Sequence, residues 1–401
     1  VTLGYDNADR RTSLTLPNTN SVTYAYNAAS ELTSLTYKKG VTVLGDLTYT
    51  YDLTGNRIKT GGSFARATIP PALTTVSYNA NNQQTTFGTN TETYDLNGNL
   101  NTVTDAGVTA TYTWNARNQL AGISTTGFAA SFAYDSFGRR TDRTVQGVVT
   151  NYVYDGLNPV QEKAGATVTA NLLTGLGIDE FFTRTDGVGV RGLLPDALGS
   201  TVALGDGTGT LQTQYTYEPF GYATQTGLAS SSSYKYTGRE DDGTGLSYYR
   251  ARYYHPRLQR FIGEDPIRFR GGDVNFYSYV RNNPIRLIDP FGLRPLTLRE
   301  RKCLKPYIPQ VDLDNADLHD GEVPWYLGPG YRAITRGNDI YVRPGEYALG
   351  GIGLLGHELY HVGQYRQGKT WVDFVIEGLI NGHDNSPLEI PAIALELQIR
   401  E

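Results

Sequence analysis

The sequence predicts a mostly β protein that ends in a small α+β domain. Three observations point to this fold class. Turn-forming and aromatic residues are abundant, with 46 Gly and 30 Tyr in 401 residues, and only 19% of residues are charged. An aromatic residue followed by Asp or Asn recurs about 20 residues apart in the first part of the chain. A buried-helix pattern of apolar residues occurs at 352–367, close to the C-terminal end.

Several of the repeated pairs are followed by a turn and then by alternating polar and apolar residues, and we expect each unit to fold as a β-hairpin. In the runs 94–100 and 134–140, the Asp would accept hydrogen bonds from the turn backbone and the Gly would supply positive φ. One hairpin is marginal alone, so the units should stack into a long sheet, with the aromatic residues as packing groups rather than a binding surface. The pairs begin at Tyr5, Tyr26, Tyr51, Tyr78, Tyr94, Trp114, Tyr134 and Tyr154.

These hairpins resemble the YD repeats of RHS and teneurin-type proteins, over about residues 1–160. The resemblance implies a β-sheet shell that spirals around a hollow interior. Residues 161–293 resemble the RHS-associated core, which plugs the end of such shells. The composition changes after Leu293, so that 294–401 is expected to be a separate C-terminal domain. The core resemblance rests on an ordered series of motifs: Leu194–Ser200, Tyr217–Gly221, Tyr236–Glu240, Leu246–Tyr254 and Asp289–Leu293.

Two Asp-Pro steps, at Asp265 and Asp289, frame the end of the core. Paired carboxylates that share a proton can serve as acid and base in peptide hydrolysis. In the RHS family the corresponding pair, with an arginine that matches Arg252, is held to cut the chain after the motif that ends here in Leu293. The implied products are 1–293 and 294–401. This sequence departs from the family motif at Arg268, where a glycine is usual, and both aspartates could instead cap turns.

The clearest chemical motif in the C-terminal domain is His357-Glu358-Leu359-Tyr360-His361. On a helix, His357 and His361 project from one face, where their ring nitrogens can hold Zn²⁺. Glu358 would then accept a proton from the attacking water. The alternative is an ordinary pair of helix histidines. The pattern favours a zinc-dependent peptidase.

A third zinc ligand must come from elsewhere in the chain. The metzincin motif is excluded, because Gln364 and Gln367 replace its glycine and histidine and the chain has no methionine. The run Asn385, Pro387, Glu389 and Ala392 resembles the segment that supplies the last ligand in gluzincin-type peptidases and in HExxH domains of bacterial polymorphic toxins. The resemblance selects Glu389, with His383, Asp384 and Glu396 as rivals.

Other tail residues are candidates for supporting roles. The segment 339–343 has the pattern of a strand that could form a cleft edge for an extended peptide, or equally a plain core strand. Tyr360, Tyr365 and Arg366 could each stabilise the oxyanion, and the sequence does not rank them.

Charge and composition limit the classes of partner. The net charge of −5 without a long basic run favours neither nucleic acid nor an anionic membrane, and no segment has the length and apolarity of a membrane helix. The lone Cys303 forms no internal disulfide. The absence of methionine suggests a fragment or processed piece of a longer protein.

The order of shell, core, cleavage motif and distinct tail resembles a polymorphic RHS toxin used in competition between bacteria. The resemblance implies a secreted or target-cell-delivered protein, a protein substrate in the target cell, an immunity protein and a delivery apparatus such as type VI secretion. Two alternatives remain. The chain could be a surface recognition or adhesion protein with an inert tail, or the tail could bind zinc without catalysis.

Overall fold

The computed structural model describes nearly all of the chain up to Leu293 and short stretches beyond it. The described residues are 1–8, 10–271, 273–293, 317–320, 333–336, 339–342, 354–355, 357–362, 364–365, 369, 386–389 and 391–393. The chain divides into two compact units. The first comprises Val1–Gly175, Asp179–Pro266 and Asp273–Leu293, and the second Leu176–Ile178, Ile267–Gly272 and Arg294–Glu401.

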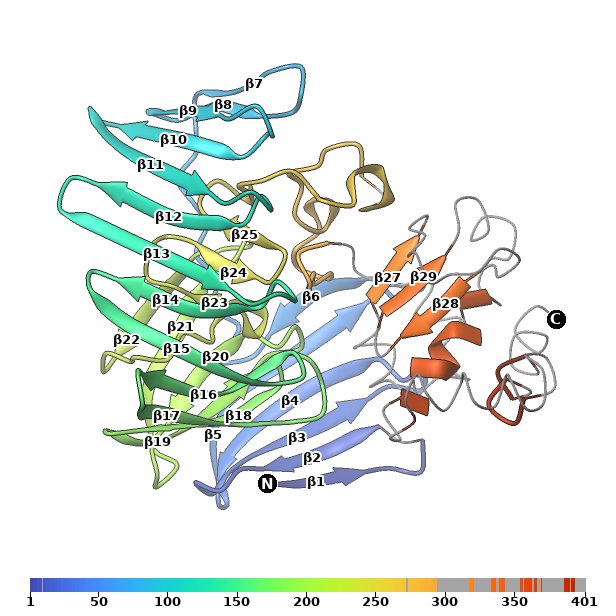
Figure 1. The fold of residues 1–401 in the computed structure, drawn as a ribbon. Helices are drawn as coiled ribbons and strands as arrows, with labels where there is room; N and C mark the ends of the chain where they lie inside the picture. Colours follow the sequence, from blue (N-terminus) through green and yellow to red (C-terminus); the bar gives the residue numbers. More distant parts are fainter. Residues whose placement is uncertain are drawn as a thin grey trace. The chain divides into compact units, whose positions relative to one another are not determined.

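The first unit is built from antiparallel strands that pair in chain order, as Figure 1 shows. A six-stranded sheet contains β1 (Thr2–Tyr5), β2 (Arg11–Thr15), β3 (Asn20–Tyr26), β4 (Leu32–Lys39), β5 (Thr42–Tyr51) and β6 (Arg57–Gly61). A sixteen-stranded sheet contains β7 (Val76–Tyr78), β8 (Gln84–Phe87), β9 (Asn90–Tyr94), β10 (Leu100–Asp105), β11 (Val108–Trp114), β12 (Leu120–Thr125), β13 (Phe128–Tyr134), β14 (Arg140–Val145), β15 (Val148–Asp155), β16 (Asn158–Ala164), β17 (Thr167–Thr174), β18 (Phe181–Asp186), β19 (Gly189–Pro195), β20 (Thr201–Gly205), β21 (Leu211–Tyr217) and β22 (Ala223–Gly227).

The turns between these strands follow the predicted Tyr-Asp chemistry. In the turn between β13 and β14, Oδ1 of Asp135 accepts the backbone N–H groups of Phe137 and Arg139, each at 2.9 Å. Gly138 has φ +84°, which the turn requires and which glycine adopts without strain. Asp95 makes the same pair of bonds between β9 and β10. The predicted roles of Asp and Gly are confirmed.

In five of the eight pairs, the aromatic residue donates a hydrogen bond to a backbone carbonyl of the preceding strand. The hydroxyl of Tyr134 donates to the Leu120 carbonyl at 2.7 Å, and that of Tyr154 donates to the Arg140 carbonyl at 2.8 Å. Trp114 makes the equivalent bond from its indole nitrogen to Leu100. A buried polar tip on an aromatic ring needs such a partner. The bonds explain why an aromatic residue with a donor stands at this position.

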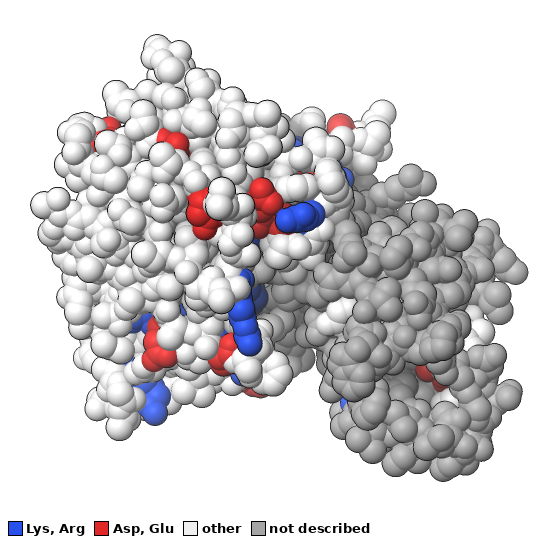
Figure 2. All heavy atoms as spheres, turned by 45° about the horizontal axis from the view of Figure 1, so that its top comes forward, with Lys and Arg blue, Asp and Glu red and all other residues white. Residues whose placement is uncertain are grey.

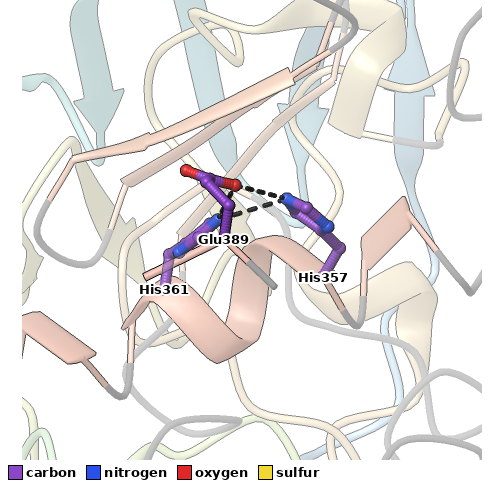
Figure 3. Close-up of side chains that lie close together, drawn as sticks. All are labelled: His357, His361 and Glu389. Carbon is purple, nitrogen blue, oxygen red and sulfur yellow. Dashed lines mark hydrogen bonds and ion pairs between the residues drawn. The ribbon is translucent and has the colours of Figure 1, made fainter. Parts of the chain in front are cut away.

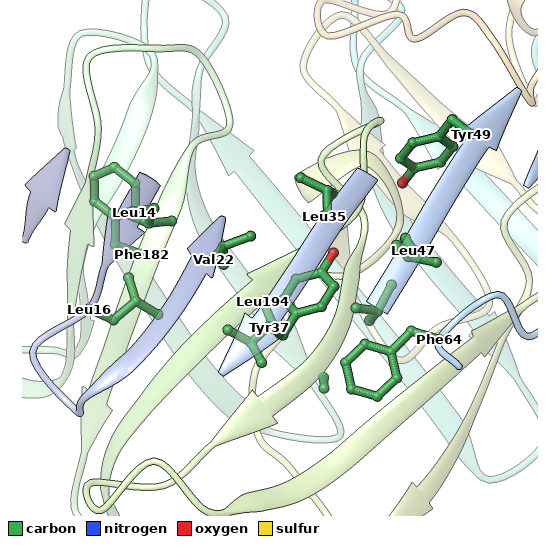
Figure 4. Close-up of a cluster of buried hydrophobic side chains, with 12 residues drawn as sticks. Leu14, Leu16, Val22, Leu35, Tyr37, Leu47, Tyr49, Phe64, Phe182 and Leu194 are labelled. Atoms are coloured by element: carbon green, nitrogen blue, oxygen red, sulfur yellow. The ribbon is translucent and has the colours of Figure 1, made fainter. Parts of the chain in front are cut away.

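Several apolar clusters hold the first unit together, and two of them join separate parts of the fold. One joins the two large sheets: Leu14, Leu35 and Tyr37 from β2 and β4 pack with Phe182 and Leu194 from β18 and β19 (Figure 4). The other joins β10 to β13 with the core segment through Leu120, Phe132, Tyr248 and Tyr253. Burial of this apolar surface supplies most of the drive to fold.

Although residues 161–227 of the predicted core contribute to β16 to β22 of the sixteen-stranded sheet, its later part, residues 236–282, forms a small sheet and short helical turns. Its strands are β23 (Glu240–Asp241), β24 (Ser247–Tyr249), β25 (Arg252–His255) and β26 (Arg260–Phe261), and its 3₁₀ turns are η1 (Tyr236–Gly238) and η3 (Val280–Asn282). Because Tyr248 and Tyr253 join the cluster with β10 to β13, this sheet packs against the shell strands. The mostly β fold with a core segment is confirmed.

The second unit contains a three-stranded sheet and helical residues. Its strands are β27 (Asp317–Asp320), β28 (Ala333–Arg336) and β29 (Asp339–Val342), in the order β27-β29-β28, and the turn η2 (Arg268–Gly271) also belongs to this unit. The edge-strand interpretation of 339–343 is wrong, because β29 pairs in parallel with β27 and antiparallel with β28. Among the described strands, β28 and β27 are the edges. Arg343 lies outside the described residues.

Candidate functional sites

Arg252 lies at the centre of the first candidate site, at the start of β25. Its Nη2 atom is 3.1 Å from Oδ2 of Asp265 and 3.5 Å from Oδ2 of Asp289. All three residues are buried, at 5%, 5% and 2% exposure. The guanidinium carbon also lies 3.7 Å from the ring centre of Phe261, which shields it from water. One buried cation therefore holds both carboxylates, although they are separated along the chain.

The same arginine reaches the predicted cleavage point. Its Nη2 atom donates to the Leu293 carbonyl at 3.2 Å, and its Nε atom donates to the Gly292 carbonyl. Asp289 accepts the Leu293 backbone N–H at 3.0 Å. The structure thus brings together all four residues predicted for self-cleavage. Their role in cutting the chain stays a prediction.

The segment before Leu293 is held along its length. The Phe291 carbonyl accepts the Ala251 backbone N–H at 3.1 Å, and the Pro290 carbonyl accepts a bond from Arg250. Together with the two carbonyls bound by Arg252, four successive carbonyls are fixed by residues 250–252. Sequence reasoning missed Arg250, and the only available signal was its position two residues before Arg252.

Burial shifts the pKa values of Asp289 and Arg252 in this site. It raises the pKa of Asp289 above its usual value, against the opposing effects of Arg252 and of the backbone N–H groups of residues 291–293. Burial also lowers the pKa of Arg252, and the two aspartates oppose that effect. A carboxyl group whose pKa is raised can hold a proton and donate it, as an acid in peptide hydrolysis must.

The second candidate site lies on the helical residues 354–355, 357–362 and 364–365. Leu355, Leu359 and Val362 are almost completely buried, as the apolar spacing predicts. His357 and His361 stand one turn apart, so that their rings approach each other with centroids 4.9 Å apart. Both imidazoles therefore point to the same place.

Glu389 joins the two histidines there, as Figure 3 shows. Its Oε2 atom is 3.5 Å from Nε2 of His357 and 3.2 Å from Nε2 of His361, and the two nitrogens are 3.1 Å apart. The ligand atoms of the three residues lie within 4.8 Å of one another, and all three side chains are buried. Two imidazole nitrogens and a carboxylate oxygen are a donor set that suits Zn²⁺.

Glu358, the predicted base, is held by a neighbouring strand. Its Oε2 atom accepts the Thr335 hydroxyl at 2.6 Å, and that hydroxyl lies 2.9 Å from the Glu358 carbonyl. Thr335 is part of β28, so the edge strand and the helix meet at this carboxylate. Sequence reasoning missed Thr335, because a contact across 23 residues leaves no local pattern.

The environment of His361 raises its affinity for a proton. Burial lowers the pKa of His361, but the contacts with Glu389 and Gln364 and the charge of Glu358 raise it more, so that the net pKa lies above the ordinary 6.5. A proton on the imidazole competes with a metal ion for the same lone pair.

Several predicted alternatives lie outside the described residues. His383, Asp384 and Glu396, the rival ligands, are among them, as is Arg366. Tyr360 and Tyr365 are described and half-buried on the same helix as the two histidines.

Charged side chains are sparse on the described surface. On the face shown in Figure 2, Lys and Arg side chains are scattered and Asp and Glu side chains lie close to several of them. In the described part of the chain, no helix has the length and apolarity needed to cross a membrane.

The stacked Tyr-Asp hairpins and the packed core segment define the class of YD-repeat shell proteins. Comparison with known families agrees: residues 1–285 match the Teneurin YD-shell family, and the chain belongs to it. The predicted YD-repeat resemblance is therefore confirmed. Residues 310–369, which include the HExxH motif, match a second family described as the eCIS core domain.

Individual relatives share parts of this chain. Toxin subunit YenC1 of Yersinia entomophaga is 44% identical over 103 residues, which cover 24% of this chain and 10% of that protein. The tRNA nuclease WapA of Bacillus subtilis is 38% identical over 104 residues, which cover 24% of this chain and 4% of that protein. The chain thus matches only a small part of the length of these relatives.

A solved structure confirms the shell fold. The crystal structure described as TcdB2-TccC3-Cdc42 superposes with a TM-score of 0.54 and 21% identity, covering 73% of this chain and 19% of that one. At this identity the likeness concerns the fold alone.

Proposed function

We propose that the chain is part of a toxin in which the β shell carries a zinc-dependent peptidase, residues 294–401, and releases it by cutting after Leu293. The observation that carries the proposal is the convergence of His357, His361 and Glu389 from two separate segments. The charge of Glu358, on the same helix, acts on His361. The names of the relatives, a toxin subunit and a tRNA nuclease, support delivery as a toxin.

His357, His361 and Glu389 would hold the zinc ion through Nε2, Nε2 and a carboxylate oxygen. Zinc, when bound, would supply Lewis-acid polarisation to the peptide carbonyl and to the attacking water. Glu358 takes the proton from water and passes it to the leaving amine. Thr335 keeps that carboxylate in place through its hydroxyl bond to Oε2. The substrate class is a protein of the target cell.

Self-cleavage uses the Arg252 site. Water adds across the Leu293–Arg294 peptide bond, giving a carboxylate on Leu293 and an amino group on Arg294. Arg252 Nη2, which already donates to the Leu293 carbonyl, stabilises the negative charge that develops on that oxygen. Asp265 accepts the proton of water, and Asp289, whose pKa burial raises, donates one to the leaving nitrogen.

The peptidase proposal is tested by expressing the chain in bacteria as the parent and as Glu358→Gln. We expect the parent to be toxic and to cut identifiable cell proteins, as read by mass spectrometry of new termini, and the variant to do neither. Equal toxicity of parent and variant would favour a zinc-binding tail without catalysis. Thr60→Ala, an exposed change in β6, controls for expression.

A delivery apparatus and an immunity protein belong to the same proposal. If the tail is toxic on release, the producing cell needs a protein that neutralises it. Co-expression of the neighbouring open reading frame should restore growth of cells that make the parent chain. Growth that stays inhibited with every neighbouring frame would count against an adjacent immunity protein.

A further inference from the structure

Gln364 uses both ends of its side-chain amide inside the second candidate site. It lies one turn after His361 on the same helix and is 9% exposed. Its Oε1 atom is 2.8 Å from Nδ1 of His361, and its Nε2 atom donates to the Leu388 carbonyl at 2.9 Å. Leu388 directly precedes Glu389. One side chain therefore touches both segments that supply the site.

These contacts determine the tautomer of His361. The Leu388 carbonyl can only accept, so the amide nitrogen of Gln364 must face it. The amide oxygen then faces His361, and because that oxygen also only accepts, the imidazole must carry its proton on Nδ1. When the ring is neutral, the lone pair is therefore on Nε2, which is the atom that faces Glu389 and His357.

The segment that Gln364 contacts, residues 386–389, is held by hydrogen bonds of its own. The Leu388 backbone N–H donates to the Ser386 hydroxyl at 3.2 Å, and the Glu389 backbone N–H donates to the Ser386 carbonyl at 3.0 Å. The Glu389 carbonyl accepts the Ile393 N–H at 2.9 Å, where the next helical residues begin. The bond from Gln364 to Leu388 therefore ties the backbone of Glu389 to the histidine helix.

We propose that Gln364 is a positioning residue, which holds His361 in the Nδ1–H tautomer and ties Glu389 to the histidine helix so that three ligands are preorganised for zinc. The inference rests on the proposed zinc site and deepens it. Partners of ligating histidines commonly change metal affinity by about 10- to 100-fold. Gln364 would raise zinc affinity through two contacts, one with the ligand His361 and one with Leu388, which precedes the ligand Glu389.

The test compares zinc affinity in the full chain and in three variants, by competition with a chromophoric chelator. Gln364→Leu removes both contacts. Gln364→Glu keeps an acceptor toward His361 and loses the donor toward Leu388. Lys369→Ala changes an exposed residue near the same helix and serves as the control. The visible absorption of the Co²⁺-loaded proteins and the thermal midpoints of the metal-free proteins are recorded beside the affinities.

We expect about 10- to 100-fold weaker zinc binding for Gln364→Leu, a smaller loss for Gln364→Glu, and no change for Lys369→Ala. The Co²⁺ spectrum should change in Gln364→Leu, since the ligand geometry changes. If the parent binds zinc and Gln364→Leu binds it equally, the inference is wrong while the zinc site stands, even if the thermal midpoint falls. If the parent itself binds no zinc, both are wrong.

Discussion

The Arg252 site and the His357 site both bury carboxylates, but they obtain positive charge in different ways. Asp265 and Asp289 share the guanidinium of Arg252, which is charged at any physiological pH. The Glu389 carboxylate lies close to two imidazoles, which are charged only when protonated. The cation of the first site is thus an arginine side chain of the protein itself. The second site has a set of ligand atoms that suits a metal cation.

The difference also appears in what each site holds. Arg252 donates to the carbonyls on the N-terminal side of the predicted cut, so the segment that it holds is part of its own chain. In the second unit, Thr335 of β28 donates to the predicted base Glu358, and under the proposed function the substrate is a separate protein. Under the proposed function, the first site makes a single internal cut and the second acts repeatedly on separate proteins.

The largest effect is expected from Glu358→Gln. The change leaves the three ligand side chains in place and removes the proton acceptor, so peptidase turnover should fall about 10²- to 10⁴-fold. Zinc content should stay the same, which distinguishes this variant from His357→Ala. Turnover of the purified chain on a protein substrate measures it. Unchanged turnover would show that Glu358 is not the base.

Asp289→Asn should stop or greatly slow self-cleavage, by about 100-fold or more, because the amide cannot donate the required proton. The parent should convert from 44.1 kDa to two pieces ending and starting at Leu293 and Arg294, while the variant stays at 44.1 kDa. Gel electrophoresis over time and N-terminal sequencing provide the measurement. Asp273→Asn, in a nearby turn, is the control, and an equally fast cut in Asp289→Asn would contradict the proposed acid.

Raising the pH should lower the stability of the metal-free second site and raise its affinity for zinc. The raised pKa of His361 means that the folded metal-free protein binds a proton more tightly than the unfolded chain, so this stabilisation is present at low pH and is lost as pH rises through the folded pKa. Zinc competes with that proton, so zinc affinity should fall about tenfold per pH unit below the pKa.

Thermal midpoints and zinc titrations between pH 5 and pH 8 measure both trends. Zinc affinity that is constant over this range would contradict a histidine ligand at position 361. The rate of cleavage after Leu293, which depends on the Arg252 site, should not change when zinc is added or removed. This difference separates the two sites.

The smallest effect is expected in the shell. Asp135→Ala removes two backbone hydrogen bonds and one to Arg139 from an exposed turn, and we expect a loss of about 1 kcal/mol in the free energy of unfolding. Phe137→Ser, at the exposed tip of the same turn, should change it by less than about 0.5 kcal/mol. Urea unfolding followed by tyrosine fluorescence compares them, and equal stability of both variants would contradict the assigned turn role.

The sequence predicts features that depend on neighbouring residues. The Tyr-Asp turns follow from hydrogen bonds over four residues, as at Asp135, and the histidine pair follows from helical spacing. Glu389 was reached only through resemblance to other peptidase segments, since spacing alone did not separate it from its rivals. The structure brings it to the two histidines.

Features that depend on tertiary contacts could not be predicted. The strand 339–343 was a candidate edge, but its pairing with β27 and β28 depends on segments separated along the chain. Thr335 and Arg250 act through contacts that no local pattern records. Gln364 entered the sequence argument only as a residue that excludes one motif, and its bond to Leu388 became visible once the two segments were adjacent.

Zinc content of the full chain, purified without chelators and measured by mass spectrometry of the metal, tests the central claim most directly. We predict one zinc ion per chain in the parent and in Glu358→Gln, and loss of that ion in His357→Ala, His361→Ala and Glu389→Ala. A folded parent chain that binds no zinc, or a Glu389→Ala chain that keeps the full amount, would contradict the proposed site.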